Sequence, residues 1–168
     1  MVKMTSNHDY KFAVLTISDS GHLGERKDLS GDKAVEVMIN LCYTEIYRDI
    51  VPDEVDLISS KLIEWADSGK VDVILTTGGT GVSPRDRTPE ATKLVLDYEI
   101  PGIPEAIRVG TSKFTEMSML TRGLAGISSI CLIVNLPGST KGVQQGLDVI
   151  SGVITHTIAL CQNTDRLH

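Results

Sequence analysis

The chain has 168 residues, of which 41% are hydrophobic and 23% are charged. This length and composition are typical of one soluble globular domain and exclude a collagen-like, disordered or membrane-embedded chain. The formal net charge of −6 argues against a broad nucleic-acid-binding surface, because such surfaces accumulate lysine and arginine. An anionic ligand must therefore be held locally, by N–H groups at helix starts, by one or two basic side chains, or by a bound cation.

The start of the chain is polar and lacks the apolar core of a secretory signal. No apolar run approaches the ~20 residues that span a bilayer, so we expect a cytoplasmic protein with no membrane partner. We expect residues 1–10 to be a flexible N-terminus, residues 11–163 to form one domain and residues 164–168 to be a tail.

The 3 cysteines, Cys42, Cys131 and Cys161, occur singly among apolar neighbours. They lack the paired spacing of zinc or redox motifs. We therefore predict that they are buried thiols.

Short apolar, β-rich runs alternate with segments whose apolar residues recur at helical spacing. Strands are predicted at residues 12–18, 44–51 and 71–77, and a hairpin within 124–136 around Ser128 and Ser129. One helix is predicted from Ser30 as N-cap, a second from Pro52 to about residue 69, and a third from Thr88 as N-cap with Pro89 as first helical residue. Gly102 and Pro104 are predicted to separate the third helix from a fourth over 105–114. A fifth is predicted over 139–161, with a break near residue 151. This order predicts a single-domain, doubly wound, mostly parallel α/β sheet with helices on both faces and a small antiparallel hairpin.

Ligands of such a sheet bind beyond the carboxyl ends of its strands. Four loops follow predicted strands, at residues 19–29, 52–53, 78–87 and 137–142. We expect these loops to converge on one rim of the sheet.

The glycine-rich segment TTGGTG (residues 76–81) directly follows a predicted buried strand. Its glycines let the backbone approach a ligand closely and direct N–H groups at an anion. The pattern also fits an ordinary turn, because it has neither a Walker lysine nor GxGxxG spacing. Its position at the end of a strand favours a ligand site.

Two aspartates follow predicted strands. Asp86 lies two residues before the expected cap Thr88 and is not needed to cap that helix. It can be an exposed carboxylate, an ion-pair partner of Arg85 or Arg87, or a ligand of Mg²⁺ at a nucleotide phosphate, because a hard cation prefers carboxylate and phosphate oxygens. Asp53 begins a helix, where an aspartate ordinarily acts as N-cap. Its position after a strand also makes it a candidate for the ligand site.

The segment PGSTKG (residues 137–142) lies between a predicted strand and a helix. It presents hydroxyl groups, free N–H groups of a helix start and the ammonium of Lys141, which are the parts of an oxyanion cradle. The structural alternative is an N-cap with a solvent-exposed lysine, and the spacing alone does not separate the two.

Taken together, these segments resemble the MogA/MoaB family of molybdenum cofactor proteins, and the G domain of gephyrin is similar. The resemblance covers about residues 12–161 in family order. Its most specific parts are TTGGTG and PRDRTPEAT (residues 84–92), and the other matching parts are SDS (18–20), DLSG (28–31), VPDE (51–54), PG (101–102) and NLPGS (135–139). LTRG (120–123) departs from the more usual LSR by a serine-to-threonine exchange that keeps the hydroxyl and the arginine.

The resemblance implies an α/β homotrimer that transfers AMP from ATP to the terminal phosphate of molybdopterin, with Mg²⁺ as cofactor and with release of pyrophosphate. It implies Asp53 and Asp86 as catalytic residues and Mg²⁺ ligands. The implied substrate-binding residues are Asp19, Ser20, Thr77, Gly78, Gly79, Thr80, Gly81, Pro137, Gly138, Ser139 and Lys141. Transient contacts with molybdopterin synthase and the molybdenum-insertion enzyme are also expected. We expect Met117, Met119 and Leu120 to pack in the core or in a subunit contact.

The chemistry of the residues agrees with this activity. Joining two polyanions requires neutralisation of charge as a phosphate oxygen attacks the α-phosphorus, and Mg²⁺ on carboxylates together with directed N–H groups supplies it. A phosphate nucleophile is already ionised near neutral pH, so no general base is needed. We therefore assign Asp53 and Asp86 to metal and phosphate positioning and not to proton abstraction.

Other functions compete with this one. A non-catalytic member of the same family would bind molybdopterin or act as a scaffold, but the presence of both aspartates argues for the enzyme. The molybdenum-insertion enzyme contains a similar domain and normally carries further ones, for which 168 residues leave no room. A P-loop kinase is disfavoured because the Lys-Ser/Thr ending of its loop is missing.

Overall fold

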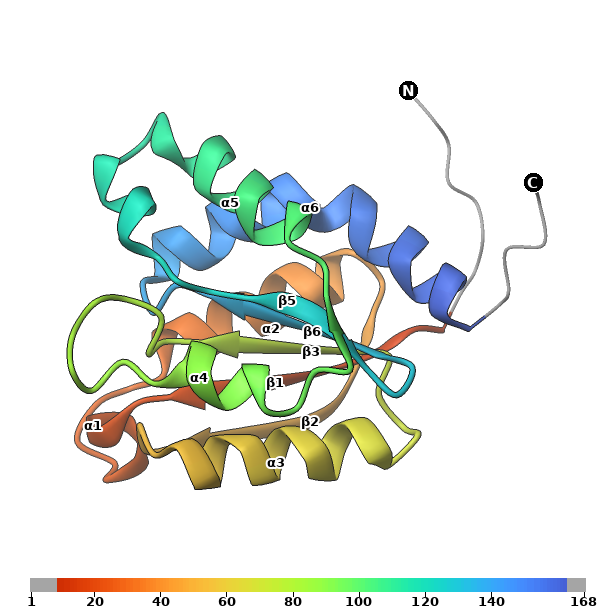
Figure 1. The fold of residues 1–168 in the computed structure, drawn as a ribbon, viewed down its shortest axis with the longest axis horizontal. Helices are drawn as coiled ribbons and strands as arrows, with labels where there is room; N and C mark the ends of the chain where they lie inside the picture. Colours follow the sequence, from red (N-terminus) through yellow and green to blue (C-terminus); the bar gives the residue numbers. More distant parts are fainter. Residues whose placement is uncertain (1–8, 163–168) are drawn as a thin grey trace.

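The computed structural model describes residues 9–162, which form a sheet between two layers of helices (Figure 1). The six strands have the order β2-β1-β3-β6-β5-β4. The parallel strands are β1 (Lys11–Ile17), β2 (Thr44–Val51), β3 (Val73–Thr77) and β6 (Cys131–Leu136), and β5 (Ala125–Ser128) and β4 (Tyr98–Glu99) are added antiparallel. The predicted mostly parallel sheet with a small hairpin is confirmed.

Helices cover both faces of this sheet (Figure 1). Side chains of β1 are buried on both faces because successive side chains of a strand alternate: Phe12 packs in one apolar cluster and Ala13 in the other. The first cluster includes α2 (Leu29–Asn40), α5 (Gly102–Ser112) and α6 (Thr140–Cys161), and the second includes α3 (Val55–Asp67) and α4 (Thr88–Lys93). The short α1 (Asp19–His22) and the 3-10 helix η1 (Glu116–Leu120) lie in connecting segments.

Three predicted helix starts are wrong in detail. Asp28, not Ser30, caps α2, and its side chain accepts the N–H of Gly31. Thr88 does not cap α4 but is its first residue, and its hydroxyl donates to Gly78 O at 2.9 Å. The helix predicted over 105–114 is separate from α4 as expected, but it starts earlier, at Gly102. Gly102 and Pro104 lie in its first turn, where the N–H that proline lacks would have no partner within the helix.

Two further expectations also fail. The break predicted near residue 151 is absent, and α6 continues because Ile150, Ile154 and Ile158 bury one face of it at helical spacing. Cys42 is exposed at the turn after α2, with a φ of 66°, so only Cys131 of the predicted buried thiols is fully buried. Cys161 is half-buried.

The ends of the chain predicted to be flexible lie mostly outside the described residues. Tyr10, at the border of the N-terminal segment, is buried and packs on Tyr43 with 5.9 Å between ring centroids. Between residues 9 and 162, no helix has the length and apolarity needed to cross a membrane.

Candidate active site

The loops that follow the parallel strands meet at the carboxyl ends of those strands, as predicted. The loops after β1 and β2 are joined because the N–H of Asp53 donates to Asp19 Oδ1 at 3.0 Å. The loops after β3 and β6 touch, since a Cβ on Gly138 would lie 3.1 Å from the Cα of Gly78. The Gly78 N–H also donates to Leu136 O at 3.3 Å. One rim therefore carries all four candidate segments.

The glycine-rich loop needs its glycines for conformation and for space. Gly78 and Gly79 have φ values of 95° and 62°, in the left-handed region that favours glycine. A Cβ on Gly79 would lie 2.7 Å from Asp53 Oδ1. The backbone of the loop is thereby pressed against the carboxylate of Asp53.

The hydroxyl groups of the same loop face the protein interior. Thr77 and Thr80 are buried. The Thr77 hydroxyl donates to Ser30 Oγ at 2.7 Å, and Thr80 Oγ1 lies 3.3 Å from Thr121 Oγ1. Their side chains hold the loop in place.

Asp53 lies between β2 and α3 and does not act as the helix cap that its position suggested. The N-cap is Glu54, which makes no side-chain capping bond. Asp53 Oδ1 is buried and has no hydrogen-bond partner within residues 9–162. Burial, together with the negative charges of Asp19 and Asp86, raises the pKa of Asp53 to about 6. A buried carboxylate whose charge is not compensated indicates a ligand site.

Arg85 spans the carboxylates around Asp53. Its guanidinium donates to both oxygens of Asp19 at 2.9 Å and to Glu54 Oε1 at 2.9 Å. The N–H of Asp53 and the guanidinium of Arg85 hold the pKa of Asp19 below its usual range. Asp19 is therefore neutralised by protein groups, whereas Asp53 is not.

Asp86 lies at the end of the glycine-rich loop, close enough to raise the pKa of Asp53 by charge repulsion. Its Oδ2 accepts the N–H of Ser83 at 2.8 Å. The ion pair considered with Arg85 or Arg87 is not formed within residues 9–162, since Arg85 pairs with Asp19 and Glu54 instead. In the described part of the chain, the Asp86 carboxylate therefore has no ion-pair partner.

Arg122 clamps the loop that carries Asp86, a role that the sequence did not indicate. Its side chain donates to Gly81 O at 2.7 Å and to Asp86 O at 2.8 Å, and it pairs with the carboxylate of Glu90. Its own N–H donates to Thr80 O at 2.8 Å. One guanidinium thus fixes both ends of the loop and the first turn of α4.

We expect Arg122→Gln to loosen this loop without unfolding the domain. The free energy of unfolding should fall by about 2 kcal/mol, because several charge-assisted hydrogen bonds are lost. Amide hydrogen exchange within residues 80–87 should become at least tenfold faster. Arg108→Gln is the matched control, because Arg108 donates one long bond of 3.5 Å to Thr121 O. Equal exchange in both variants would contradict the clamp.

A polar cavity of about 490 Å³ opens between the loop after β1, the start of α2 and the start of α6. Gly78, Gly138, Ser139 and Lys141 line it together with residues of the loop after β1, so three of the predicted loops contribute to one space. Ser139 caps α6 by accepting the N–H of Gly142 at 3.0 Å. The ammonium of Lys141 has no hydrogen-bond or ion-pair partner in residues 9–162. This wall can bind an anionic group.

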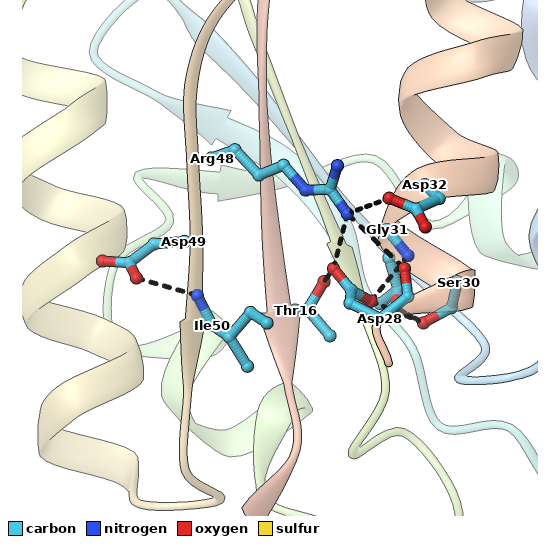
Figure 2. Close-up of polar contacts among 9 residues, drawn as sticks. Thr16, Asp28, Ser30, Gly31, Asp32, Arg48, Asp49 and Ile50 are labelled. Atoms are coloured by element: carbon cyan, nitrogen blue, oxygen red, sulfur yellow. Dashed lines mark hydrogen bonds and ion pairs between the residues drawn. The ribbon is translucent and has the colours of Figure 1, made fainter. Parts of the chain in front are cut away.

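Asp28 also lines the cavity, and it is another residue that the sequence did not single out as a site residue. Figure 2 shows its carboxylate between β1, β2 and α2, where it accepts from Thr16 Oγ1 (2.8 Å), Gly31 N (2.8 Å) and Arg48 (2.9 Å). Burial opposes its ionisation, but these bonds outweigh burial and lower the pKa of Asp28. Arg48 also pairs with Asp32 at 2.7 Å. The network fixes the loop in front of α2.

Four of the predicted site residues fall into two neighbouring groups. The carboxylates of Asp53 and Asp86 form the first, and their oxygen donors suit a hard cation such as Mg²⁺. In the described part of the chain, no three His, Cys, Asp or Glu side chains are grouped as a complete metal site. A cation here would need ligands from a substrate phosphate or from water. Ser139 and Lys141 form the second group, and the contact between Gly78 and Gly138 joins the two.

The chain is similar to known proteins along most of its length. The family model with the description "Probable molybdopterin binding domain" matches residues 13–156. The chain is 43% identical over 150 residues to the molybdenum cofactor synthesis protein cinnamon of Drosophila melanogaster. This match covers 89% of the chain and 25% of cinnamon, so the chain spans about a quarter of that relative.

Two further relatives are matched along most of their length. The molybdopterin adenylyltransferase of Helicobacter pylori strain 26695 is 39% identical over 149 residues, which covers 88% of this chain and 85% of that protein. The crystal structure of the molybdopterin biosynthesis enzyme MoaB from Thermus thermophilus superimposes with a TM-score of 0.87 at 42% identity. It covers 92% of this chain and 97% of the MoaB chain.

Proposed function

Because this chain belongs to the molybdopterin-binding domain family, which includes MoaB and the molybdopterin adenylyltransferases, we propose that it transfers AMP from ATP to molybdopterin in molybdenum cofactor biosynthesis. An oxygen of the terminal phosphate of molybdopterin attacks the α-phosphorus of ATP. A new P–O bond forms, the bond from the α-phosphorus to the bridging oxygen of the β-phosphate breaks, and pyrophosphate leaves with that electron pair. The products are adenylylated molybdopterin and pyrophosphate.

The observation that carries this proposal is the unsatisfied carboxylate of Asp53. Its buried Oδ1 lies against the glycine-rich loop, and burial together with neighbouring negative charges raises its pKa to about 6. A site for transfer between two polyanions needs such carboxylates to hold positive charge at the phosphates. An ordinary helix cap would instead be satisfied by backbone N–H groups.

Each group of residues has a separate task in this reaction. Asp53 and Asp86 would hold Mg²⁺, which neutralises charge on the phosphates when bound. Ser139, Lys141 and the first N–H groups of α6 bind the acceptor phosphate. That phosphate is ionised near neutral pH, so no side chain has to remove a proton.

The direct test is to incubate the purified protein with molybdopterin, ATP and MgCl₂ and to measure adenylylated molybdopterin and pyrophosphate. We expect the two products in equal amounts and only in the presence of all three reactants. Binding of molybdopterin without any product would overturn the enzymatic proposal and favour a binding or scaffold protein of the same family. The proposed transient contacts are tested separately, by adding molybdopterin synthase or the molybdenum-insertion enzyme to the purified protein.

We expect Lys141→Ala to weaken the binding of molybdopterin by roughly 10- to 150-fold, the equivalent of losing a charged hydrogen bond of about 1.5–3 kcal/mol. The fold should be unaffected, because the Lys141 ammonium has no partner in residues 9–162. The control is Lys93→Ala, which removes an exposed lysine paired with Glu99. Unchanged affinity for molybdopterin in folded Lys141→Ala protein would remove this lysine from the site.

The protein is expected to be a homotrimer. Met117, Met119 and Leu120 were expected in the core or in a subunit contact, and η1 leaves all three exposed in the single chain, with fractions of 62%, 70% and 46%. Burial in a subunit contact would remove this apolar surface from water. Sedimentation equilibrium at micromolar concentration should give the mass of three chains, and a monomeric mass would contradict the expectation.

A further inference from the structure

The polar cavity of about 490 Å³ contains groups of opposite charge that compete for an anionic ligand. Ser139 and Lys141, assigned to the acceptor phosphate, line it together with Asp28, which supplies the only carboxylate among the described residues of its wall. The side chain of Asp28 is 7% exposed, so water screens its charge poorly. An unbalanced negative charge at this place would oppose the binding of a phosphate.

The carboxylate of Asp28 is ionised, because it is the acceptor in each of its hydrogen bonds within residues 9–162. Its Oδ1 accepts the N–H of Gly31 at 2.8 Å and the hydroxyl of Ser30 at 3.4 Å. Its Oδ2 accepts the hydroxyl of Thr16 at 2.8 Å and the guanidinium of Arg48 at 2.9 Å. A protonated carboxyl group would have to give up one of these bonds.

Arg48 balances the charge of Asp28 from outside the cavity. It lies on β2 and is not part of the cavity wall. Figure 2 shows its side chain extending past β1 to Asp28 and to Asp32, which accepts at 2.7 Å. The side chain of Asp32 is 63% exposed, so water already screens its charge. The charge that depends on Arg48 is therefore that of Asp28.

Ser30 connects this ion pair to the glycine-rich loop. Its Oγ accepts the hydroxyl of Thr77 at 2.7 Å and donates to Asp28. Thr77 is the last residue of β3 and precedes Gly78, which lines the cavity. The carboxylate of Asp28 is thus fixed between the start of α2 and this loop.

We propose that Arg48 is a positioning residue for the acceptor phosphate, because it neutralises Asp28 and so lets the cavity bind an anion beside a buried carboxylate. This role rests on the proposed function, which assigns the phosphate to Ser139 and Lys141. Loss of the Arg48 charge leaves Asp28 buried and unbalanced, which disfavours a phosphate in the cavity. Loss of the Asp28 charge leaves Arg48 positive, which favours a phosphate. The two substitutions break the same ion pair but change phosphate binding in opposite directions.

The test measures binding of 6-hydroxymethylpterin phosphate and of 6-hydroxymethylpterin to the full-length protein, because the ratio of the two dissociation constants isolates the contribution of the phosphate. Arg48→Gln should weaken binding of the phosphate ester at least ~5-fold relative to the parent pterin. Asp28→Asn should bind the ester as tightly as the wild type or more tightly, since asparagine still caps α2. The double variant should bind the ester more tightly than Arg48→Gln alone.

A purely structural role of the ion pair predicts a different result. Both single variants should unfold at a lower temperature than the wild type, because each breaks the same pair. If Arg48 only supported the loop, both would also bind the ester more weakly, and the double variant would recover nothing. Weaker ester binding in Asp28→Asn, an unchanged ratio in Arg48→Gln, or equal affinity of the wild type for the two probes would each overturn the role of Arg48.

Lys61→Gln is the matched control. Lys61 also bridges two carboxylates, those of Asp49 at 3.4 Å and Glu64 at 3.0 Å, and Asp49 points away from Arg48 (Figure 2). This variant should keep the wild-type ratio. The opposite effects of the two substitutions in a protein that forms no adenylylated product would sustain the role of Arg48 and reject adenylyl transfer. Adenylyl transfer by a wild type whose ratio is the same in all variants would reject the role of Arg48 alone.

Discussion

Asp86→Asn is expected to lower adenylyl transfer at least ~100-fold while leaving the stability of the protein nearly unchanged. Within the described residues, the carboxylate of Asp86 makes one hydrogen bond, in which Oδ2 accepts the N–H of Ser83 at 2.8 Å. The amide oxygen of asparagine can accept the same hydrogen bond. The substitution therefore removes the charge that would hold Mg²⁺ and retains the turn. Steady-state rates at saturating MgCl₂ and a thermal unfolding curve measure the two effects.

A matched control lies elsewhere in the chain. Asp97 also uses its Oδ2 to accept a loop N–H, that of Ser129, at 2.7 Å, but it lies far along the sheet, next to β4 and the β5–β6 turn. Asp97→Asn should keep both stability and transfer. Asp86→Ala should lose transfer and, in addition, about 1 kcal/mol of stability with the hydrogen bond to Ser83. Transfer close to the wild-type rate in folded Asp86→Asn protein would show that Asp86 only shapes the loop.

Local sequence patterns identified the strands other than the two-residue β4, and the rim on which the site lies. Buried parallel strands read as continuous apolar runs, and the loops that follow them must share one edge of the sheet. The pattern therefore predicts that Asp53 and the TTGGTG loop lie on the same rim of the sheet. Helix boundaries were predicted less accurately because several polar residues compete for each cap. Asp28 caps α2 where Ser30 was expected, because hydrogen bonds from Arg48 and Thr16 also hold its carboxylate in place.

Long-range contacts were beyond the reach of sequence patterns. The clamp by Arg122 joins residues 41 positions apart, and the network of Arg48 joins β2 to the start of α2. No local spacing marks either arginine. The missed parts of the site are thus those that need tertiary contacts.

The structure distinguishes two interpretations of the Asp53 carboxylate, a helix cap and a ligand of a cation. As a helix cap it would stabilise the fold by ~1 kcal/mol. In the structure, Glu54 is the N-cap, and Asp53 Oδ1 is buried without a partner beside two other carboxylates. Ionised Asp53 therefore destabilises the folded protein in the absence of a cation, which is the reverse of what a cap does.

Asp53→Asn is accordingly expected to abolish most adenylyl transfer, by at least ~100-fold, and to stabilise the protein in buffers without divalent cations. The direction of the change in stability follows from the pKa of Asp53, which is about 6 in the folded chain and ordinarily 3.8. A raised pKa means that the folded state binds the proton more tightly, so the wild-type protein loses stability as the pH rises from about 4 to about 6. The variant lacks this loss. Its free energy of unfolding should equal that of the wild type near pH 4 and exceed it by about 1 kcal/mol above pH 6, after allowance for solvent screening.

Asp56→Asn, three residues further along the chain, is the control and should show neither effect. Urea unfolding at pH 4, 5, 6 and 7.5 measures this difference, and a variant less stable than the wild type above pH 6 would return Asp53 to the role of a cap.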